Sequence, residues 1–395
     1  MTDTPRVLIL ADDLTGAMDA AGPFASRGLA TSVAAVPEDC EPGRFAKASV
    51  VAINTESRHL PPAEAAERIE RLFRQVGGDN FGIVLKKVDS TLRGNVIAET
   101  VALMTASQRP AALACTAFPA QGRVVKGGSV VVHGVPLAQT SFATDALSPA
   151  LSQPIDSAFV EATGAPAAVL SSTELQQCPD AGMCVVDAEN DDDLDRVAAA
   201  GIAASSRFLL VGSAGLGAAL SRALAVEGAA AEPPAVLGRI VYVVGSRAPA
   251  SREQVGTLVA DGARLVEAVN GRLRKEPVLS PGADVVLMAV PDRSGKEGDA
   301  HEVATMLARH AMRLVGPGNA QAIVATGGDT AIAFLRNSGN PVLSVGGELL
   351  PGIAYARFMM GTRPVWLVTK AGGFGDADAL RRIGQRLREG APGGA

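Results

Sequence analysis

The chain has 395 residues, of which 47% are hydrophobic, 19% charged and 4% aromatic, so it is long enough for two or three domains and too apolar for intrinsic disorder. Its 36 basic and 41 acidic residues give a net charge of −5, which argues against nucleic acid as a partner. No apolar run reaches the roughly 18 residues of a membrane helix, and no signal-peptide pattern opens the sequence. These features predict a soluble cytoplasmic protein without a membrane partner.

Short aliphatic runs alternate with Ala-rich amphipathic stretches along the first half. This alternation predicts an α/β fold with mostly parallel sheets flanked by helices. The predicted strands are 7–11, 50–53, 82–86, 111–116, 183–186 and 208–211, and the predicted helices are 15–27, 63–76 and 95–106. The Val- and Gly-rich stretch 123–137 predicts a β-ribbon, and residues 138–160 predict a long functional loop.

An Ala-, Pro- and Gly-rich stretch at 226–238 is typical of a linker and divides the chain into domains 1–228 and 238–395. The strand–helix alternation resumes after it, with predicted strands at 240–244, 285–290, 322–325, 342–345 and 365–368. Two α/β domains, with the active site in the cleft between them, are therefore the expected architecture.

Two adjacent carboxylates follow the first strand, at Asp12 and Asp13. The carboxyl edge of an open α/β sheet is where ligands bind, so a functional role is expected for one of them. The other is expected to cap the following helix, as Asp does at a helix start. Asp12 is the candidate for orienting or deprotonating a reacting hydroxyl group.

A dense polar cluster, Lys86 to Asn95, follows the third strand, and further arginines follow the second and fourth strands. Cations at this edge suit an anionic ligand, because arginine holds a carboxylate through two hydrogen bonds. The candidate residues are Arg58, Lys87, Asp89, Ser90, Arg93 and Arg123. The local alternatives are a helix cap at Ser90 or Thr91, a solvated Lys86 and an exposed loop position for Arg58.

Three glycine-rich loops follow strands of the second half, at 245–247, 326–330 and 369–375. Glycines let backbone N–H groups approach a phosphate, and a helix N-terminus favours the anion, so together the loops predict a nucleotide site. The sequence has no P-loop and no strict Gly-x-Gly-x-x-Gly fingerprint, and 212–217 is interpreted as a close strand–helix turn. Glu348 is expected either to assist a metal ion or to form a turn.

Together these motifs resemble those of the four-carbon acid-sugar kinases. The stretches that carry the resemblance are 11–17, 86–95, 118–123, 245–246, 326–330, 347–352 and 370–375, in this order along the chain. The stretch that begins at Lys86 and ends at Gly94 looks most like that of D-threonate kinases, whereas 3-oxo-tetronate kinases tend to carry Lys at the position of Arg93.

The resemblance implies an acid-sugar domain at 1–228 and a nucleotide-binding domain at 238–395. It implies transfer of the γ-phosphoryl group of ATP to the terminal 4-hydroxyl of D-threonate, with 3-oxo-tetronate or D-erythronate as alternative acceptors. The resemblance places Asp12, Arg58 and the loop of Lys87, Asp89 and Ser90 where the family binds its sugar acid, and Arg123 is a further substrate-binding candidate from its position after the fourth strand. The chemistry of phosphoryl transfer makes Asp12 the candidate catalytic base, Asp89 its rival, and Arg93 a cation for the transferring phosphate. The implied ATP-binding residues are Ser246, Gly327, Gly328, Asp329, Thr330 and Gly372.

Mg²⁺ is expected with ATP because it bridges nucleotide phosphates. No metal-binding residues are predicted from the sequence. The sequence is compatible with a homo-oligomer and does not predict an oligomeric state. Two other classes remain as alternatives: a nicotinamide-dependent oxidoreductase, and a sugar-acid sensor without catalytic activity. Nucleotide titration separates the three, because only the kinase binds ATP and only the oxidoreductase binds NAD.

Overall fold

The computed structural model describes residues 5–144, 149–225, 235–280, 282–316, 320–339, 342–360 and 362–390. The chain divides into two compact units, unit 1 at Met1–Ala229 and unit 2 at Ala230–Ala395. Most of the predicted linker, residues 226–234, lies outside the described residues. The active-site cleft expected between two domains stays a prediction.

Unit 1 contains an all-parallel sheet of strand order β2-β3-β1-β4-β11-β5-β10-β9. Every residue of β1, β3, β4 and β5 is buried, because helices cover both faces of the sheet. The strands are β1 Val7–Ala11, β2 Thr31–Ala34, β3 Val50–Asn54, β4 Ile83–Lys87, β5 Ala111–Cys115, β9 Ala167–Ser171, β10 Gly182–Asp187 and β11 Phe208–Gly212.

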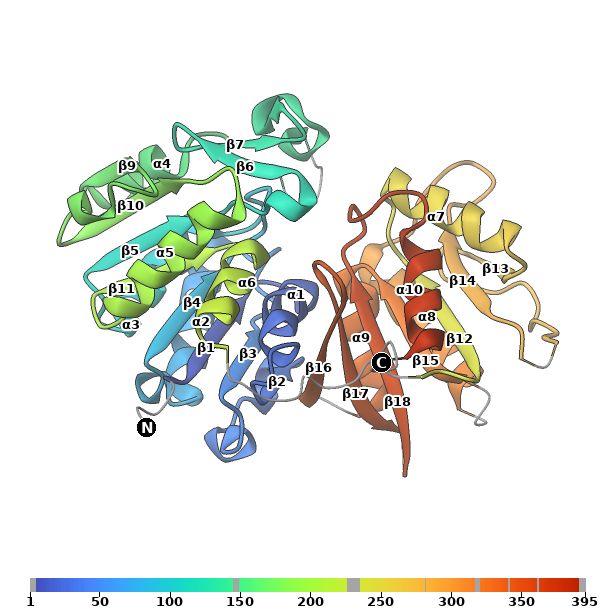
Figure 1. The fold of residues 1–395 in the computed structure, drawn as a ribbon. Coiled ribbons are helices and arrows are strands. Elements are labelled where there is room, and N and C mark those ends of the chain that lie inside the picture. Colours follow the sequence, from blue (N-terminus) through green and yellow to red (C-terminus); the bar gives the residue numbers. More distant parts are fainter. Residues whose placement is uncertain are drawn as a thin grey trace. The chain divides into compact units, whose positions relative to one another are not determined.

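The helices of unit 1 form two contacting sets, one of α1, α6 and α5 and the other of α2, α3 and α4. Figure 1 shows the first set in front of the sheet. Their bounds are α1 Leu14–Ala25, α2 Pro62–Gln75, α3 Val96–Ala106, α4 Ile155–Thr163, α5 Asp191–Ala203 and α6 Ala214–Ala223. The predicted ribbon is present as the antiparallel strands β6 Arg123–Lys126, β7 Ser129–Val132 and β8 Val135–Pro136.

Unit 2 contains strands in the order β13-β14-β12-β15-β18-β17-β16. Strands β13, β14, β12, β15 and β18 run parallel, while β17 pairs antiparallel with both β16 and β18. The strands are β12 Arg239–Val244, β13 Arg264–Val269, β14 Val285–Val290, β15 Ala320–Thr326, β16 Val342–Leu350, β17 Ile353–Met360 and β18 Arg363–Lys370.

Two helices of unit 2, α7 Pro249–Ala260 and α10 Ala379–Glu389, share a core with one face of this sheet. Residues Tyr242, Val324 and Val368 of the central strands lie in that core. The other two helices, α8 Ala300–Val315 and α9 Gly328–Ser338, contact each other and the same central strands. In the described part of the chain, no helix has the length and apolar character needed to cross a membrane.

The α/β class with mostly parallel sheets is confirmed. The loop expected at 138–160 is wrong in part, because helix α4 begins at Ile155, and residues 145–148 of that stretch lie outside the described residues. The sequence did not predict strands β2, β9, β13 and β17. Strand β2 has only four residues, β9 is mostly half-exposed, β13 mixes exposed with buried residues, and β17 contains the exposed Arg357. None of these therefore carries the fully apolar run that marks a central parallel strand.

Candidate active site

The carboxyl edge of the unit 1 sheet brings the predicted acids and cations together. Asp12 follows β1, and Arg58 follows the neighbouring β3. Two hydrogen bonds join them, from Arg58 Nε to Asp12 Oδ2 at 2.7 Å and from Arg58 Nη2 to Asp12 Oδ1 at 2.9 Å. Asp12 is 3% exposed, so this is a buried ion pair held in one orientation.

Burial would raise the pKa of Asp12, but the charge and hydrogen bonds of Arg58, with help from Lys86 and Lys87, hold that pKa below its usual 3.8. Asp12 is therefore a permanent carboxylate near neutral pH. Gly94 closes over it with a positive φ of 86°, and a Cβ there would lie 2.7 Å from Asp12 Oδ2. Only glycine fits at this position without moving the carboxylate.

Asp13 is the N-cap of α1, since its Oδ1 accepts a hydrogen bond from Gly16 N at 2.6 Å. The expectation that one of the two acids caps the helix is met. Its second oxygen pairs with Arg58 Nη1 at 2.6 Å. Arg58 therefore contacts both acids and is not the exposed loop residue of the alternative interpretation.

The loop after β4 carries a second ion pair, between Asp89 and Arg93. Arg93 donates from Nε to Asp89 Oδ2 at 2.8 Å and from Nη2 to Asp89 Oδ1 at 3.2 Å. Burial would raise the pKa of Asp89, but the charge and hydrogen bond of Arg93 outweigh it, together with Arg58 and Thr91, and hold the pKa well below its usual 3.8. Both candidate bases are therefore carboxylates already paired with arginine.

Three further candidates lie in the same region. Lys87, the last residue of β4, is 3% exposed, and its Nζ lies 3.1 Å from Val88 O and 3.4 Å from Asp19 Oδ1. Ser90 is buried. Arg123 is buried beside the Asp89–Arg93 pair, and burial lowers its pKa while Asp89 raises it. Unit 1 thus gathers all of its predicted site residues at one sheet edge.

A buried triad of Lys86, Glu99 and Ser57 lies behind this edge and was not predicted from the sequence. Lys86 is fully buried and pairs with Glu99 Oε2 at 2.9 Å, so the alternative of a solvated Lys86 is wrong. Ser57 donates a short hydrogen bond to Glu99, and burial raises the pKa of Glu99. The available signal was a charged residue on the buried face of α3, in register with Val96 and Leu103.

Three loops of unit 2 meet at Ser246, which follows β12. A Cβ on Gly372 would overlap Ser246 Oγ, and a Cβ on Gly327 would lie 3.7 Å from Ser246 N. Likewise a Cβ on Gly245 would overlap Thr330 Oγ1. Gly372 and Gly245 are therefore required for the loops to pack this closely, and Gly327 is favoured by its positive φ of 102°. Loops packed in this way suit a backbone cradle for phosphate.

The remaining nucleotide candidates lie at the start of α9. Gly328 is its first residue, and Asp329 follows with an exposed side chain. This helix start supplies the N-terminal field that favours an anion.

Two ambiguous motifs have structural roles. Glu348 Oε1 accepts a hydrogen bond from Gly352 N at 2.7 Å, which favours the turn over a metal ligand. Ser213 caps α6 through a hydrogen bond from Gly215 N at 3.1 Å, and a Cβ on Gly215 would overlap Ala117 O. The interpretation of 212–217 as a close strand–helix turn is confirmed. Within the described ranges, no three His, Cys, Asp or Glu side chains gather as a metal site.

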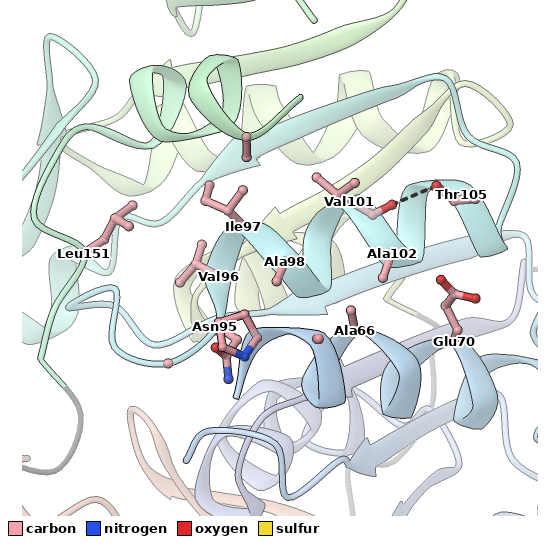
Figure 2. Close-up of a pocket in the computed structure, with 14 residues that line it drawn as sticks. Ala66, Glu70, Asn95, Val96, Ile97, Ala98, Val101, Ala102, Thr105 and Leu151 are labelled. Atoms are coloured by element: carbon pink, nitrogen blue, oxygen red, sulfur yellow. Dashed lines mark hydrogen bonds between the residues drawn. The ribbon is translucent and has the colours of Figure 1, made fainter. Parts of the chain in front are cut away.

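A cavity of about 590 Å³ lies between α2 and α3 of unit 1. Its walls are mostly apolar, with Ala66 of α2 facing Ala98 and Ala102 of α3 (Figure 2). It touches the charged edge only through Gly94 and Asn95. The ion pairs, and not this cavity, therefore define the candidate site.

Two domain families match the chain. The sugar-binding N-terminal domain matches residues 7–220, and the nucleotide-binding C-terminal domain matches residues 241–380. Together they account for most of the sequence and assign the charged edge of unit 1 to the sugar-binding part and the glycine loops of unit 2 to the nucleotide-binding part.

Curated relatives match over nearly their whole length. The D-threonate kinase of Bordetella bronchiseptica is 34% identical over 98% of both chains. The D-threonate kinase of Salmonella typhimurium is 30% identical over 95% of this chain and 96% of its own. The 3-oxo-tetronate kinase of Methylobacterium radiotolerans is 29% identical over 94% of this chain and 97% of its own.

Solved structures show the same fold. A Haemophilus influenzae protein, 21% identical, matches 96% of this chain and 100% of its own with a TM-score of 0.71. A Bordetella bronchiseptica protein, described as a domain-swapped dimer with bound citrate, is 32% identical and matches 98% of this chain and 99% of its own with a TM-score of 0.50.

Proposed function

The chain belongs to the four-carbon acid-sugar kinases, which use ATP, and we propose that it phosphorylates the terminal 4-hydroxyl of D-threonate. Support for D-threonate comes from three relatives of that name, which are 34%, 30% and 31% identical. Relatives named 3-oxo-tetronate kinase and D-erythronate kinase are 29% and 28% identical, so these two acids are the alternative acceptors.

One observation carries the proposal: a buried carboxylate, Asp12, is held by Arg58 at the carboxyl edge of unit 1, with Lys87 and Arg123 buried nearby. Cationic side chains of this kind bind the carboxylate of a sugar acid. Ser90 adds a hydroxyl group for the hydroxyls of the substrate.

In this proposal Asp12 accepts a hydrogen bond from the terminal hydroxyl and orients its oxygen toward the γ-phosphorus. Its lowered pKa makes it a weak base, which suits a loose transition state, because the hydroxyl proton becomes acidic only late in phosphoryl transfer. Asp89, whose pKa is also lowered, is the rival for this role. Arg93, paired with Asp89, supplies positive charge for the transferring phosphate.

We assign the nucleotide phosphates to the loops around Ser246 in unit 2, with Gly327, Gly328 and Gly372 allowing close backbone approach and Asp329 and Thr330 following at the start of α9. Mg²⁺ would bind together with the nucleotide phosphates. When bound, the ion neutralises phosphate charge.

The same proposal extends to cell compartment and assembly. A kinase of small acids with a net charge of −5 is expected in the cytoplasm, without nucleic acid as a partner. The relative described as a domain-swapped dimer supports a homo-oligomer. Light scattering on the purified protein tests this, and a monomer at micromolar concentration would contradict it.

An ATP-consumption screen over the threonate and erythronate isomers and the 3-oxo acids tests the function. We expect D-threonate to give the highest kcat/KM, with a phosphate monoester at C4 in the ³¹P spectrum of the product. Binding of a tetronate without ATP turnover would support the sensor instead, and turnover with NAD would support the oxidoreductase. A higher kcat/KM for another tetronate would correct the substrate and leave the reaction class intact.

A further inference from the structure

Lys370, the last residue of β18, is a fully buried lysine that the proposed reaction does not use. Its Nζ donates hydrogen bonds to the carbonyl oxygens of Ala371 at 2.9 Å, Gly372 at 3.4 Å and Phe374 at 2.9 Å. Within the described ranges no carboxylate pairs with it. Burial lowers its pKa to about 7. A lysine kept in the interior at this cost has a structural task in the loop that follows it.

Helix α7 holds the same loop and binds two of the same carbonyl groups, those of Gly372 and Phe374. Ser251 donates from Oγ to Gly372 O at 3.0 Å, and Gln254 donates from Nε2 to Phe374 O at 3.0 Å. Gln254 also reaches Gly375 O at 3.2 Å and Asp376 O at 2.9 Å. Both side chains are fully buried. The carbonyl groups of the loop are therefore turned toward the interior of unit 2.

This orientation fixes where the N–H groups point. In a planar trans peptide the C=O and the following N–H point in opposite directions. Because the carbonyls of Ala371 and Gly372 point at Lys370, the N–H groups of Gly372 and Gly373 point away from it. In the described part of the chain neither of these N–H groups donates to a protein acceptor.

The outward N–H groups lie at the place where the three glycine loops meet. Gly372 packs against Ser246, which follows β12, and Gly327 N donates to Lys370 O at 2.9 Å. Successive backbone N–H groups on a concave surface form a binding site for an anion. Lys370 itself is fully buried and so cannot touch a ligand there.

We propose that Lys370 is a positioning residue that turns the carbonyls of the 371–374 loop inward, so that the N–H groups of Gly372 and Gly373 face a phosphate of the bound nucleotide. The inference rests on the proposed function, since it assumes that unit 2 binds ATP. Beyond that function, the inference names the residue that orients the C=O and N–H groups of the 371–374 loop.

Lys370→Met tests the inference, because it keeps the length of the side chain and removes all three donors. We expect the Kd for a non-hydrolysable ATP analogue and the KM for ATP to rise on the order of tenfold or more. The Kd for adenosine, which has no phosphate, and the KM for the sugar acid should stay within twofold. Lys275→Met, which changes an exposed lysine of the same unit, is the matched control and should behave as wild type.

Equal losses for the ATP analogue and adenosine would show a general structural role and overturn the inference, as would unchanged affinity for both. Titration of the wild-type protein comes first, because a wild-type protein that bound no ATP analogue would contradict the proposed function as well as the inference. Should Lys370→Met not fold, the amide signals of Gly372 and Gly373 in the wild-type protein decide. They should shift when the analogue is added and stay in place when adenosine is added, and no shift with the analogue would contradict the inference.

Discussion

Unit 1 and unit 2 place their candidate sites at the same kind of sheet edge but build them from different groups. Unit 1 uses side-chain charges, with Asp12 paired to Arg58 and Asp89 to Arg93. Unit 2 uses backbone, with glycines packed against Ser246. An ionic, stereochemically defined acid calls for directed side chains, whereas a phosphate chain is bound well by N–H groups.

Two fully buried lysines, one in each unit, repeat this contrast. Lys86 in unit 1 pairs with the carboxylate of Glu99 at 2.9 Å. In the part of the chain that the structure describes, Lys370 of unit 2 binds only carbonyl oxygens, and burial lowers its pKa to about 7. The first lysine supports a network of charges, and the second orients a backbone loop. The same residue type at the end of a strand thus serves two different kinds of site.

The largest expected effect concerns the acid of unit 1. Asp12→Asn keeps size and polarity but loses the negative charge that orients and receives the hydroxyl proton. We expect kcat to fall on the order of 10²–10⁴-fold, with little change in ATP affinity. Asp13→Asn is the matched control and should be milder, because Asn caps a helix nearly as well as Asp. Single-turnover kinetics measures the rate of phosphoryl transfer in both variants. A deeper loss in Asp13→Asn than in Asp12→Asn would show that the role does not belong to Asp12.

The next effect concerns the cation of unit 1. Lys87→Ala removes a buried ammonium group that we expect to contact the sugar acid. Loss of a charged hydrogen bond costs about 1.5–3 kcal/mol, so the KM for the acid should rise about 10- to 100-fold while the KM for ATP stays near wild type. Lys126→Ala, whose side chain is 54% exposed, is the control. A rise in the KM for ATP alone would contradict the assignment of the sugar acid to unit 1 and of ATP to unit 2.

A smaller effect is expected from a single methyl group in unit 2. Gly372→Ala places a Cβ where Ser246 Oγ lies, so the two loops must move apart and ATP affinity should fall on the order of tenfold. Gly256→Ala adds the same group where no atom lies within 4 Å and should leave affinity unchanged. Titration with an ATP analogue compares them, and equal affinities would remove this loop from the nucleotide site.

The smallest effect is on acid stability. The pKa of Asp89 is well below its usual 3.8, so its pairing with Arg93 stabilises the fold above about pH 4, and this stability is lost as the pH falls through the folded-state pKa. Asp89→Asn should therefore be less stable than wild type at pH 7, by about 1–3 kcal/mol, with a difference that narrows toward pH 2. Urea unfolding at both pH values measures this, and a constant difference would contradict it.

The sequence predicted the parts of the site that follow apolar strands, because a strand end with polar residues is visible in the chain itself. Asp12, Arg58 and the loop after β4 were found this way. The Glu99 network was missed, since Glu99 reaches the edge from within helix α3 and its partner Ser57 is 42 residues away. Lys370 was read only as part of a motif, because hydrogen bonds to carbonyl groups leave no pattern in a sequence.

The division of labour between the two units is tested most directly by hydrogen exchange on the full-length protein with each ligand alone. We expect D-threonate to protect amides at 12–16 and 88–95 in unit 1. An ATP analogue should protect 245–248, 327–330 and 371–375 in unit 2. Protection of the unit 2 loops by D-threonate, or of the unit 1 loops by the nucleotide, would contradict the account.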